Sequence, residues 1–396
     1  MRDKQPLILV ANPGSASRKY GLFFGGKEIA SLHFEFVRNK IQCNAGVDGE
    51  SFSEPAGVSN IDDVITLVEP MLLRTGALRP NDTIDGVGLR IVAPSGYFLE
   101  NHQVDEEVLR RLNELKLVAP LHIDIIHREL TLLRKYFGNI PVYGVSDSAF
   151  HITKPEYAWN YALPLADTDK YEIKRYGYHG LSMQSTVRQL RRHDRLANKI
   201  VVAHLGSGAS VTALHGGKSL DNTMGYSPLE GLVMSTRSGT IDYSAVHALR
   251  LRLGLSEKEM DEYLYNKAGL LGLGGSSDIR ELVERENQDN HQAALALSTY
   301  VYSVQKGIAQ MVAALGDVDA LVFTGTVGER SFIMRNRIVQ RLHYLDFYMD
   351  HNKNNATDEV QNMETISELG KSKPIYVVHV DEASEIARQV AEMIIR

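Results

Sequence analysis

Apolar residues in the first part of the chain occur in short blocks that glycine turns separate. Residues 7–11 form the first block, which ends in the turn sequence Asn12-Pro13-Gly14-Ser15, and residues 19–24 and 28–36 form the next two, on either side of Gly25-Gly26. Such blocks are typical of strands in an antiparallel meander. Farther along, the spacing of apolar positions predicts helices over residues 62–73, 106–116 and 121–137 and buried strands over residues 86–92 and 141–145.

The pattern of the first strands returns about half a chain later. Residues 200–207 repeat the pattern of residues 8–15, and Gly216-Gly217-Lys218 corresponds to Gly25-Gly26-Lys27. A strand, a Gly-Ser loop, a strand and a Gly-Gly-Lys hairpin therefore occur twice, which indicates an internal duplication. It predicts two related α/β domains, each opening with a glycine-bearing β-hairpin.

The second half of the chain is mainly helical by its spacing. Apolar positions predict helices over residues 256–265, 277–286 and 291–314 and a closing amphipathic helix over residues 381–395. A short buried strand is expected over residues 320–324, leading into Gly325. Residues 351–373 are the most polar stretch, for which we expect a surface loop with a short helix.

Composition and charge fit a globular protein with room for two or three domains. The 396 residues are 43% apolar and 23% charged, and the formal net charge is -6. Because acidic and basic residues are interspersed, no nucleic-acid partner is expected, and the basic residues 188–195 are interpreted as a solvated helix face. The single cysteine, Cys43, excludes an intramolecular disulfide and fits a reducing compartment. No apolar run approaches the ~20 residues of a membrane span, so a cytoplasmic location without a membrane partner is expected.

Four glycine-rich segments could bind phosphate. A phosphate needs backbone N–H donors and room to approach them, which glycine turns at strand ends supply. None of the four matches a P-loop or has the context of a dinucleotide fingerprint, and one such segment alone is more often a plain turn. Four in one chain favour phosphate binding; they cover residues 14–17, 206–210, 272–277 and 325–329.

Isolated charged residues at strand ends complete an inventory for phosphoryl transfer. Arg90 lies inside an apolar run, where a charge is costly unless it is paired or faces a cleft. Arg237 follows a Pro-Leu-Glu-Gly turn, and the arginine fork matches both carboxylates and phosphates. Asp147 follows a strand, and His122 and His179 adjoin loop signals. Taken singly, each arginine could equally well form a structural salt bridge. Asp147 alone is more often a helix N-cap, and a lone histidine is more often a structural residue.

Other chemistries find less support. The chain has no Gly-x-Ser-x-Gly elbow, Cys43 has no histidine partner nearby in sequence, and metal-ligand histidine spacing is not evident. Phosphoryl transfer requires mainly phosphate loops, arginines and a magnesium ligand, which are the groups present.

In order along nearly the whole chain, these segments resemble the acetate kinase family, within the superfamily of acetate and sugar kinases, heat-shock proteins and actin. The segments that carry the resemblance are residues 12–19, 90–92, 119–122, 147–151, 175–180, 204–211, 224–231, 236–239, 269–272, 276–280 and 323–325. The resemblance implies an α/β protein of two duplicated ribonuclease-H-like, actin-like domains with a cleft between them. The expected domains are residues 1–150 plus 383–396 and residues 151–382, with nucleotide bound by the second.

The resemblance also implies roles for individual residues. Arg90 and Arg237 would hold the substrate carboxylate and the transferred phosphoryl group, and His179 would donate to the phosphoryl oxygens. Asp147 would orient Arg237 or the acid, because a carboxylate is already ionised at pH 7 and needs no general base. His122 would support this catalytic group. The methyl group of the acid would lie in an apolar pocket of Val92, Leu121, Tyr178 and Pro228.

Phosphate, nucleotide and metal positions follow in the same way. Asn12 and Glu382 correspond to Mg²⁺-binding positions, and Lys19 lies beside the phosphates of ATP or ADP. The remaining nucleotide positions are His204, Gly206, Ser207, Gly208, Asp278, Ile279, Arg280, Gly325, Thr326, Gly328 and Glu329.

The activity that the resemblance implies is reversible transfer of the ATP γ-phosphoryl group to acetate, giving acetyl phosphate and ADP, by a homodimer. Several positions depart from the family pattern. Tyr178 stands where the family usually has Phe, which adds a hydroxyl that needs a partner. Ser207, Thr326 and Arg330 change the phosphate and adenosine loops, and residues 93–95 and 123–124 also differ.

These departures leave alternatives open. One is a kinase for another short acid such as propionate, and another is a different phosphoryl donor such as pyrophosphate. An alternative of another class is a non-catalytic nucleotide-binding regulator, which would not need Arg90, Asp147, His179 and Arg237 together.

Overall fold

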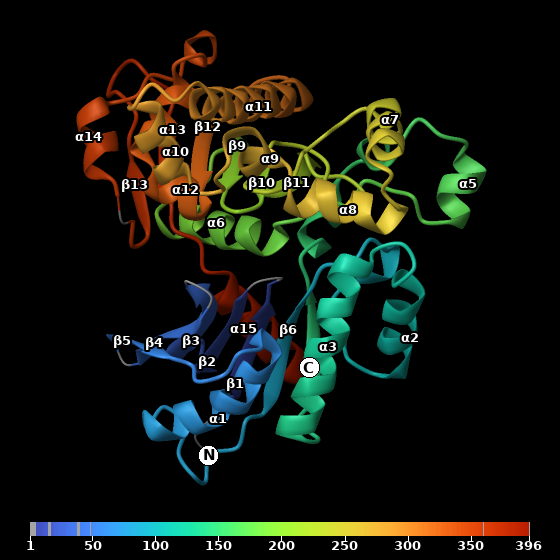
Figure 1. Cartoon of the computed structure of the whole chain (residues 1–396). Helices are drawn as coiled ribbons and strands as arrows, with labels where there is room; N and C mark the ends of the chain where they lie inside the picture. The colour runs from blue at the N-terminus through green and yellow to red at the C-terminus, as the bar shows by residue number, and fades with distance from the viewer. Residues whose placement is uncertain (1–4, 15–16, 38–39, 48, 359, 396) are drawn as a thin grey trace. The chain divides into compact units, whose positions relative to one another are not determined.

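The computed structural model describes residues 5–14, 17–37, 40–47, 49–358 and 360–395 (Figure 1). The chain divides into two compact units, the first formed by Met1–Ala149 with Asp381–Arg396 and the second by Phe150–Val380. The expected domain boundaries and the assignment of nucleotide binding to the second domain stay predictions.

Within its described residues, the first unit has an eight-stranded sheet in the order β5-β4-β3-β2-β1-β6-β8-β7. Strands β1 to β5 form an antiparallel meander, while β6 and β8 run parallel to β1 and β7 pairs antiparallel with β8. The strands are β1 (Leu7–Pro13), β2 (Ser17–Phe24), β3 (Lys27–Val37), β4 (Lys40–Val47), β5 (Glu50–Pro55), β6 (Gly86–Ile91), β7 (His102–Gln103) and β8 (Val142–Ser146).

Helices cover this sheet. Helix α15 (Glu382–Ile395) packs on β1, β6 and β8, and α3 (Pro120–Phe137) contacts β1 and α1 (Ile65–Arg74). The segment thus returns from the far end of the sequence to complete the first unit (Figure 1). The other helical segments of this unit are η1 (Ile61–Val64), η2 (Gly96–Leu99) and α2 (Glu106–Leu115).

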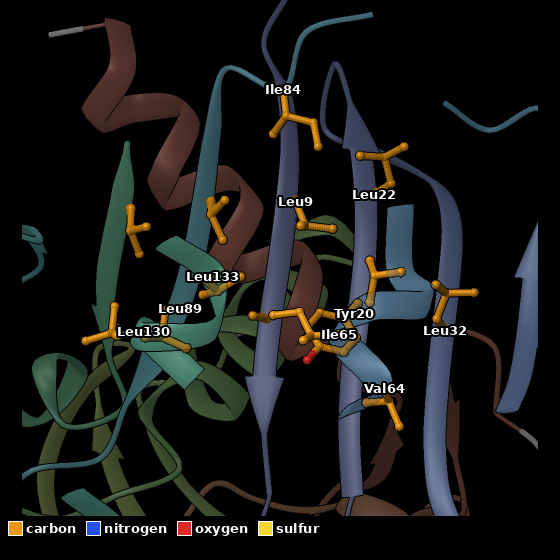
Figure 2. Packing of buried hydrophobic residues seen from close by; sticks show 14 of the residues in the cluster. Leu9, Tyr20, Leu22, Leu32, Val64, Ile65, Ile84, Leu89, Leu130 and Leu133 are labelled. Atoms are coloured by element: carbon orange, nitrogen blue, oxygen red, sulfur yellow. The ribbon is translucent and has the colours of Figure 1, made fainter. Parts of the chain in front are cut away.

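The core of the first unit follows from strand alternation. Side chains at every second position of a strand point to the same face, so Leu7, Leu9 and Ala11 of β1 belong to one buried cluster. Figure 2 shows Leu9 with Tyr20, Leu22 and Leu32 of the neighbouring strands and with Val64, Ile65, Leu130 and Leu133 of the covering helices. Burial of this apolar face holds the meander and the helices together.

The second unit repeats this architecture in a sheet of six described strands, ordered β11-β10-β9-β12-β14-β13. Strand β9 pairs antiparallel with β10 and parallel with β12, as β1 does with β2 and β6, and β14 continues the parallel set as β8 does. The strands are β9 (Lys199–Leu205), β10 (Ala209–His215), β11 (Lys218–Asn222), β12 (Ala320–Thr324), β13 (Met363–Thr365) and β14 (Ile375–Val378). The predicted duplication is confirmed.

Helix α6 buries Met183, Val187 and Leu190 in a cluster with β9, β12 and β14, and α11 packs on β9, β10 and β11. In Figure 1 these two helices lie on opposite sides of the sheet. The helical segments, in chain order, are η3 (Ala149–Thr153), α4 (Glu156–Trp159), α5 (Leu165–Lys170), α6 (Gly180–Arg192), α7 (Tyr243–Leu253), α8 (Glu257–Asn266), α9 (Gly269–Gly274), α10 (Ile279–Glu286), α11 (His291–Leu315), α12 (Gly325–Arg330), α13 (Phe332–Val339), η4 (His343–Leu345) and α14 (His351–Ala356).

Some expectations need correction. The sequence predicts a turn that includes Gly272 and Gly274, but both lie in the helix α9, and residues 325–330 form the helix α12. The polar stretch 351–373 holds the expected short helix, α14, but also β13, which pairs with β14 at the sheet edge. Among the described residues, no helix has the length and apolarity required to span a membrane.

Candidate active site

Three predicted site residues meet at one edge of the first sheet. Asn12 is near the end of β1, Arg90 is in β6, and Asp147 directly follows β8. These strands are parallel neighbours, with Leu89 opposite Ala11 and Arg90 opposite Val145. The carboxyl ends of parallel strands meet at a common edge, which is where α/β proteins bind ligands.

Arg90 lies at the centre of this group. Its Nη2 donates to Asp147 Oδ2 at 2.8 Å, and its Nη1 lies 3.2 Å from Glu382 Oε2 and 3.5 Å from Asn12 Oδ1. Burial alone would lower the pKa of Arg90, but the carboxylates of Asp147 and Glu382 outweigh burial and raise it. The guanidinium therefore stays charged, in a fixed orientation.

Asp147 is almost fully buried, with 1% of its side chain exposed. Its backbone N–H donates to the carbonyl of Ile91 at 2.9 Å, which extends the pairing of β8 with β6 by one residue. The carboxylate that sequence reasoning assigned to Arg237 or the acid thus contacts Arg90. A buried carboxylate bound to an arginine orients that arginine.

Asn12 and Glu382 supply two oxygen donors beside Arg90. Asn12 Nδ2 donates to Glu382 Oε2 at 3.4 Å, and Glu382 is the first residue of α15. Magnesium is held in many kinases by one or two oxygen side chains together with substrate phosphates. Among the described residues, no cluster of three or more His, Cys, Asp or Glu could hold a metal alone. The donor set therefore fits a Mg²⁺ ion that is shared with phosphate oxygens.

A buried arginine, Arg18, hydrogen-bonds to the backbone of the first glycine loop. Arg18 donates through Nη1 to the carbonyls of Gly14 and Ser17 and through Nη2 to Asp62 Oδ1 at 2.7 Å. Its Nε lies 3.2 Å from Glu129 Oε2, and Glu129 accepts from the Tyr20 hydroxyl at 2.7 Å. Ser15 and Ala16, which belong to the predicted phosphate loop, lie outside the described residues.

The remaining first-unit candidates lie on the same elements. Lys19 is exposed on β2, opposite Asn12 in the register with β1. Val92 follows β6, and Leu121 and His122 are in the first turn of α3, all three partly buried. Their roles in the acid pocket and in catalysis stay predictions.

In the second unit, two histidines lie beside the Gly206–Gly208 turn that joins β9 to β10. His179 precedes α6 with φ 60° and ψ 28°, a left-handed conformation that costs a non-glycine residue on the order of 1–2 kcal/mol. His204 is in β9, and the two ring centroids are 4.2 Å apart. Such strained backbone is concentrated at functional sites.

Arg237 and His179 converge on Gly208. A Cβ atom at Gly208 would lie 3.1 Å from His179 Nε2 and 3.4 Å from Arg237 Nη1. The turn is closed by the Gly206 N–H, which donates to the Gly208 carbonyl at 2.9 Å, and Ser207 is exposed at its tip. Glycine therefore leaves room for a ligand beside an imidazole and a guanidinium.

The segment that carries Pro228 is held by polar contacts. Arg237 Nη1 donates to the Pro228 carbonyl at 3.3 Å, and the guanidinium lies 5.9 Å from the centre of the Tyr265 ring. The Tyr178 hydroxyl donates to the Tyr226 carbonyl at 2.6 Å. Tyr178 is 1% exposed, so its extra hydroxyl is satisfied inside the protein.

The segment that the family resemblance assigns to adenosine binding forms the start of α12. Gly325 has φ 78°, and a Cβ there would lie 2.8 Å from the Leu205 carbonyl oxygen, so glycine is required. Its N–H donates to Glu329 Oε1 at 3.0 Å, and Glu329 Oε2 lies 2.8 Å from His379 Nδ1. Gly328 is buried, while the divergent Thr326 and Arg330 are exposed.

The predicted nucleotide residues of α10 have local structural roles. Asp278 caps the helix by accepting from the Arg280 N–H at 2.8 Å, and it pairs with the Arg280 guanidinium at 2.7 Å. The hydrogen bond from the Arg280 side chain lowers the pKa of Asp278. Arg280 is 92% exposed and Ile279 is buried, so within the second unit Arg280 is accessible to a ligand.

The residues that hold the predicted site residues in position were not predicted from the sequence. Ser182 and Ser210 contact the two histidines, and Glu129 pairs with Arg18. Only Arg18 had a local signal, because a charged residue two positions before buried Tyr20 on a strand must point into the core.

The comparisons with known proteins cover the whole chain. The sequence profile of the acetokinase family matches residues 7–388. The chain is 34% identical to the acetate kinase of Campylobacter jejuni subsp. doylei over 394 residues, which are 98% of this chain and 99% of the relative. The crystal structure of Porphyromonas gingivalis acetate kinase is 30% identical with a TM-score of 0.84, covering 99% of this chain and 100% of the other. The Francisella tularensis propionate kinase structure is 30% identical with a TM-score of 0.87, covering 97% and 98%.

The duplicated fold and these neighbours define a two-domain phosphotransferase of the actin-like ATPase fold, as the sequence predicted. Arginines and oxygen ligands of Mg²⁺ are groups that phosphotransferases commonly use to bind phosphates. The chain belongs to the acetokinase family.

Proposed function

We propose that this protein transfers the γ-phosphoryl group of ATP reversibly to acetate, giving acetyl phosphate and ADP. The observation that carries the proposal is the convergence of His179 Nε2 and Arg237 Nη1 on Gly208, in a chain that belongs to the acetokinase family. This arrangement suits an anion whose charge is spread over several oxygens, as in a phosphoryl group during transfer.

In the forward reaction, an oxygen of the acetate carboxylate attacks the γ-phosphorus. The new P–O bond forms while the bond to the bridging oxygen of ADP breaks, and ADP leaves with that electron pair. Because carboxyl groups have a pKa of about 4, acetate is ionised at pH 7 and no general base is required. Asp147 therefore acts by holding the Arg90 guanidinium, to which it is bound at 2.8 Å.

The two reactants are both anionic and repel each other. We propose that Arg90 binds the carboxylate while Arg237 and His179 bind the phosphoryl oxygens, so that fixed positive groups and N–H donors offset the repulsion. Asn12 and Glu382 would hold Mg²⁺, which supplies further neutralisation of the phosphate charge. Lys19, exposed beside Asn12, would contact the same phosphates.

Acetate is proposed as the substrate because the curated relatives of this chain are acetate kinases, and Tyr178 does not add an unsatisfied polar group that would argue against an apolar acid pocket. Its hydroxyl donates to the Tyr226 carbonyl, so the ring offers the acid an apolar face. Propionate is the second candidate, since a propionate kinase is among the similar structures. One methylene discriminates only about 10- to 200-fold in an apolar pocket, so both acids belong in the assay.

We also propose a homodimer, associated through the second unit. Helix α7 has no buried residue, and Tyr243, Leu251 and Leu253 are 80%, 62% and 49% exposed. Exposed apolar surface of this kind is typical of an interface. For the location we propose the cytoplasm, where the single cysteine, Cys43, stays reduced and nucleotides are abundant.

Formation of acyl phosphate tests the proposed function. The protein is incubated with Mg²⁺, with acetate, propionate or butyrate, and with ATP, GTP or pyrophosphate, and the acyl phosphate is trapped by hydroxylamine. Hydroxamate with ATP and acetate supports the proposal. Product with another donor alone would indicate that Ser207, Thr326 and Arg330 change the specificity for the phosphoryl donor. No hydroxamate under any combination would contradict it and favour a nucleotide-binding regulator.

A further inference from the structure

Three histidines of the second unit each have a serine hydroxyl at Nδ1. Ser210 Oγ lies 2.9 Å from His179 Nδ1, Ser182 Oγ lies 2.8 Å from His204 Nδ1, and Ser219 Oγ lies 2.8 Å from His151 Nδ1. The serines come from different elements, β10, α6 and β11. All three hydroxyls are buried, with Ser182 and Ser210 at 0% and Ser219 at 2% exposure.

The pair at His151 shows the direction of the hydrogen bond. His151 Nε2 lies 2.9 Å from the Tyr178 carbonyl oxygen, which only accepts, so Nε2 carries the proton. In a neutral imidazole Nδ1 is then an acceptor, and the Ser219 hydroxyl donates to it. This serine fixes the Nε2–H tautomer of its histidine.

At His179 and His204, the direction of the hydrogen bond follows from the environment of the serine hydroxyls. Among the described residues, neither Ser182 nor Ser210 has a second hydrogen-bond partner, and neither is exposed to solvent. If Nδ1–H donated to the serine oxygen, the hydroxyl proton would be buried without an acceptor, which costs roughly 1–3 kcal/mol. The satisfied arrangement has Ser O–H donating to Nδ1 and the imidazole proton on Nε2.

Both Nε2 atoms lie at the Gly206–Gly208 turn. A Cβ at Gly206 would be 3.6 Å from His204 Nε2, and a Cβ at Gly208 would be 3.1 Å from His179 Nε2. The two ring centroids are 4.2 Å apart and the ring planes are tilted by 34°, with the Arg237 guanidinium close to Gly208. Two imidazolium ions beside this guanidinium would repel each other and it, so neutral rings fit the geometry.

We propose that Ser182 and Ser210 are positioning residues that hold His204 and His179 as neutral Nε2–H tautomers, so that both rings donate to one anionic group at the Gly206–Gly208 turn. The anion is a phosphoryl or phosphate group, which rests on the proposed function. Neutral donors bind phosphate oxygens in both directions of a reversible transfer without adding charge that would retain a product.

The tautomers are measured in the wild-type protein by long-range ¹H–¹⁵N NMR of ¹⁵N-histidine-labelled protein, with His179→Gln and His204→Gln spectra for assignment. The expected result is a protonated Nε2 and an unprotonated, hydrogen-bonded Nδ1 in both rings. A proton on Nδ1 of either ring would overturn the proposal, and this readout depends on neither activity nor the folding of a serine variant.

Kinetics test whether the serines act through the histidines. Ser182→Ala and Ser210→Ala are expected to lower kcat about 10- to 100-fold, the loss typical when the hydrogen-bond partner of a metal-bound histidine is removed, with the KM for the acid little changed. Thr186→Val is the matched control, because Thr186 is buried in α6 and its hydroxyl has no hydrogen-bond partner among the described residues.

Two further outcomes separate the claims. Unchanged kcat in folded Ser182→Ala and Ser210→Ala proteins, or an equal loss in Thr186→Val, would overturn the positioning role. Expected tautomers in a wild-type protein without activity toward any acid or donor would instead contradict the proposed function and support the tautomer assignment. Ser182→Cys and Ser210→Cys, which replace the hydroxyl by a slightly larger and weaker thiol donor, serve if an alanine variant does not fold.

Discussion

Arg18 and Glu129 form an ion pair in the core of the first unit, with Arg18 Nε and Glu129 Oε2 3.2 Å apart and side chains only 2% and 1% exposed. Burial raises the pKa of Glu129, against the hydrogen bond from Tyr20 and the charge of Arg18, which lower it. The same guanidinium binds the carbonyls of Gly14 and Ser17. The pair therefore connects the core to the first glycine loop.

Arg18→Leu is expected to destabilise the protein by about 3–5 kcal/mol, because it leaves a carboxylate buried without its charge partner. Arg18→Leu/Glu129→Leu is expected to recover part of this loss, since it removes the buried carboxylate but still leaves the Gly14 and Ser17 carbonyls and the Tyr20 hydroxyl without these partners. Urea unfolding of both variants measures the difference. A double variant that is no more stable than Arg18→Leu would show that the ion pair is not the source of the effect.

Tyr178→Phe removes a hydroxyl whose partner is the Tyr226 carbonyl, two residues before Pro228. Loss of a buried hydrogen bond is expected to cost about 1 kcal/mol in stability, while the ratio of kcat/KM for acetate to that for propionate changes less than threefold. The acid panel measures this ratio. A change of tenfold or more would show that the hydroxyl itself contacts the acid.

Glu382→Gln is expected to raise the Mg²⁺ concentration for half-maximal activity about tenfold, because one anionic ligand becomes a neutral one. Weaker Mn²⁺ binding in the presence of ADP, measured by electron paramagnetic resonance, is the expected readout without turnover. Glu392→Gln, an exposed position on the same helix, is the control. Equal Mn²⁺ affinity in wild type and Glu382→Gln would show that Glu382 does not bind the metal.

Lys154 is a buried amine in the second unit, 5% exposed, with Nζ bound to the Arg175 carbonyl and 4.4 Å from the centre of the Trp159 ring. Burial lowers its pKa to about 8. Below pH 8 the amine is protonated in the folded and unfolded chains, and its desolvation cost applies in full. The cost shrinks between pH 8 and 10.5, where only the unfolded chain keeps the proton.

Replacing Lys154 by Met is therefore expected to affect the free energy of unfolding more favourably at pH 7 than at pH 9.5. The expected difference is about 2 kcal/mol, because the cost falls by about 1.4 kcal/mol for each pH unit from the folded-state pKa of about 8 up to pH 9.5. Any pH-dependent part of the contact with the Arg175 carbonyl is already contained in the folded-state pKa of Lys154, so it needs no separate correction. Urea unfolding of wild type and variant at the two pH values measures this difference. A difference that is independent of pH would contradict the lowered pKa.

Much of this architecture is predictable from local pattern. Alternation and glycine turns identified the first strands of both sheets, and the repeat of the Gly-Ser and Gly-Gly-Lys segments identified the duplication. Arg90 was conspicuous because a charge inside an apolar strand needs a partner. Its meeting with Asn12 follows once β1 and β6 are known to be parallel neighbours.

The rest depends on tertiary contacts that no local pattern encodes. Glu129 is one of several acidic residues on helices, and only the packing of α3 on β1 brings it to Arg18. Ser182 is unremarkable in α6 until His204 of β9 lies against it. Helix α7 carries several apolar side chains but has no buried residue, which only the tertiary structure shows.

In the proposed mechanism, Arg237 binds the phosphoryl group during its transfer to a carboxylate. The most direct test compares hydroxylamine-trapped acetyl phosphate from ATP and acetate for wild type, Arg237→Ala and the control Arg341→Ala, an exposed arginine of the same unit. We predict product with wild type and the control, and a loss of kcat of roughly 100-fold or more in Arg237→Ala, as for removal of a group that stabilises transition-state charge. Equal rates in wild type and Arg237→Ala would contradict the mechanism.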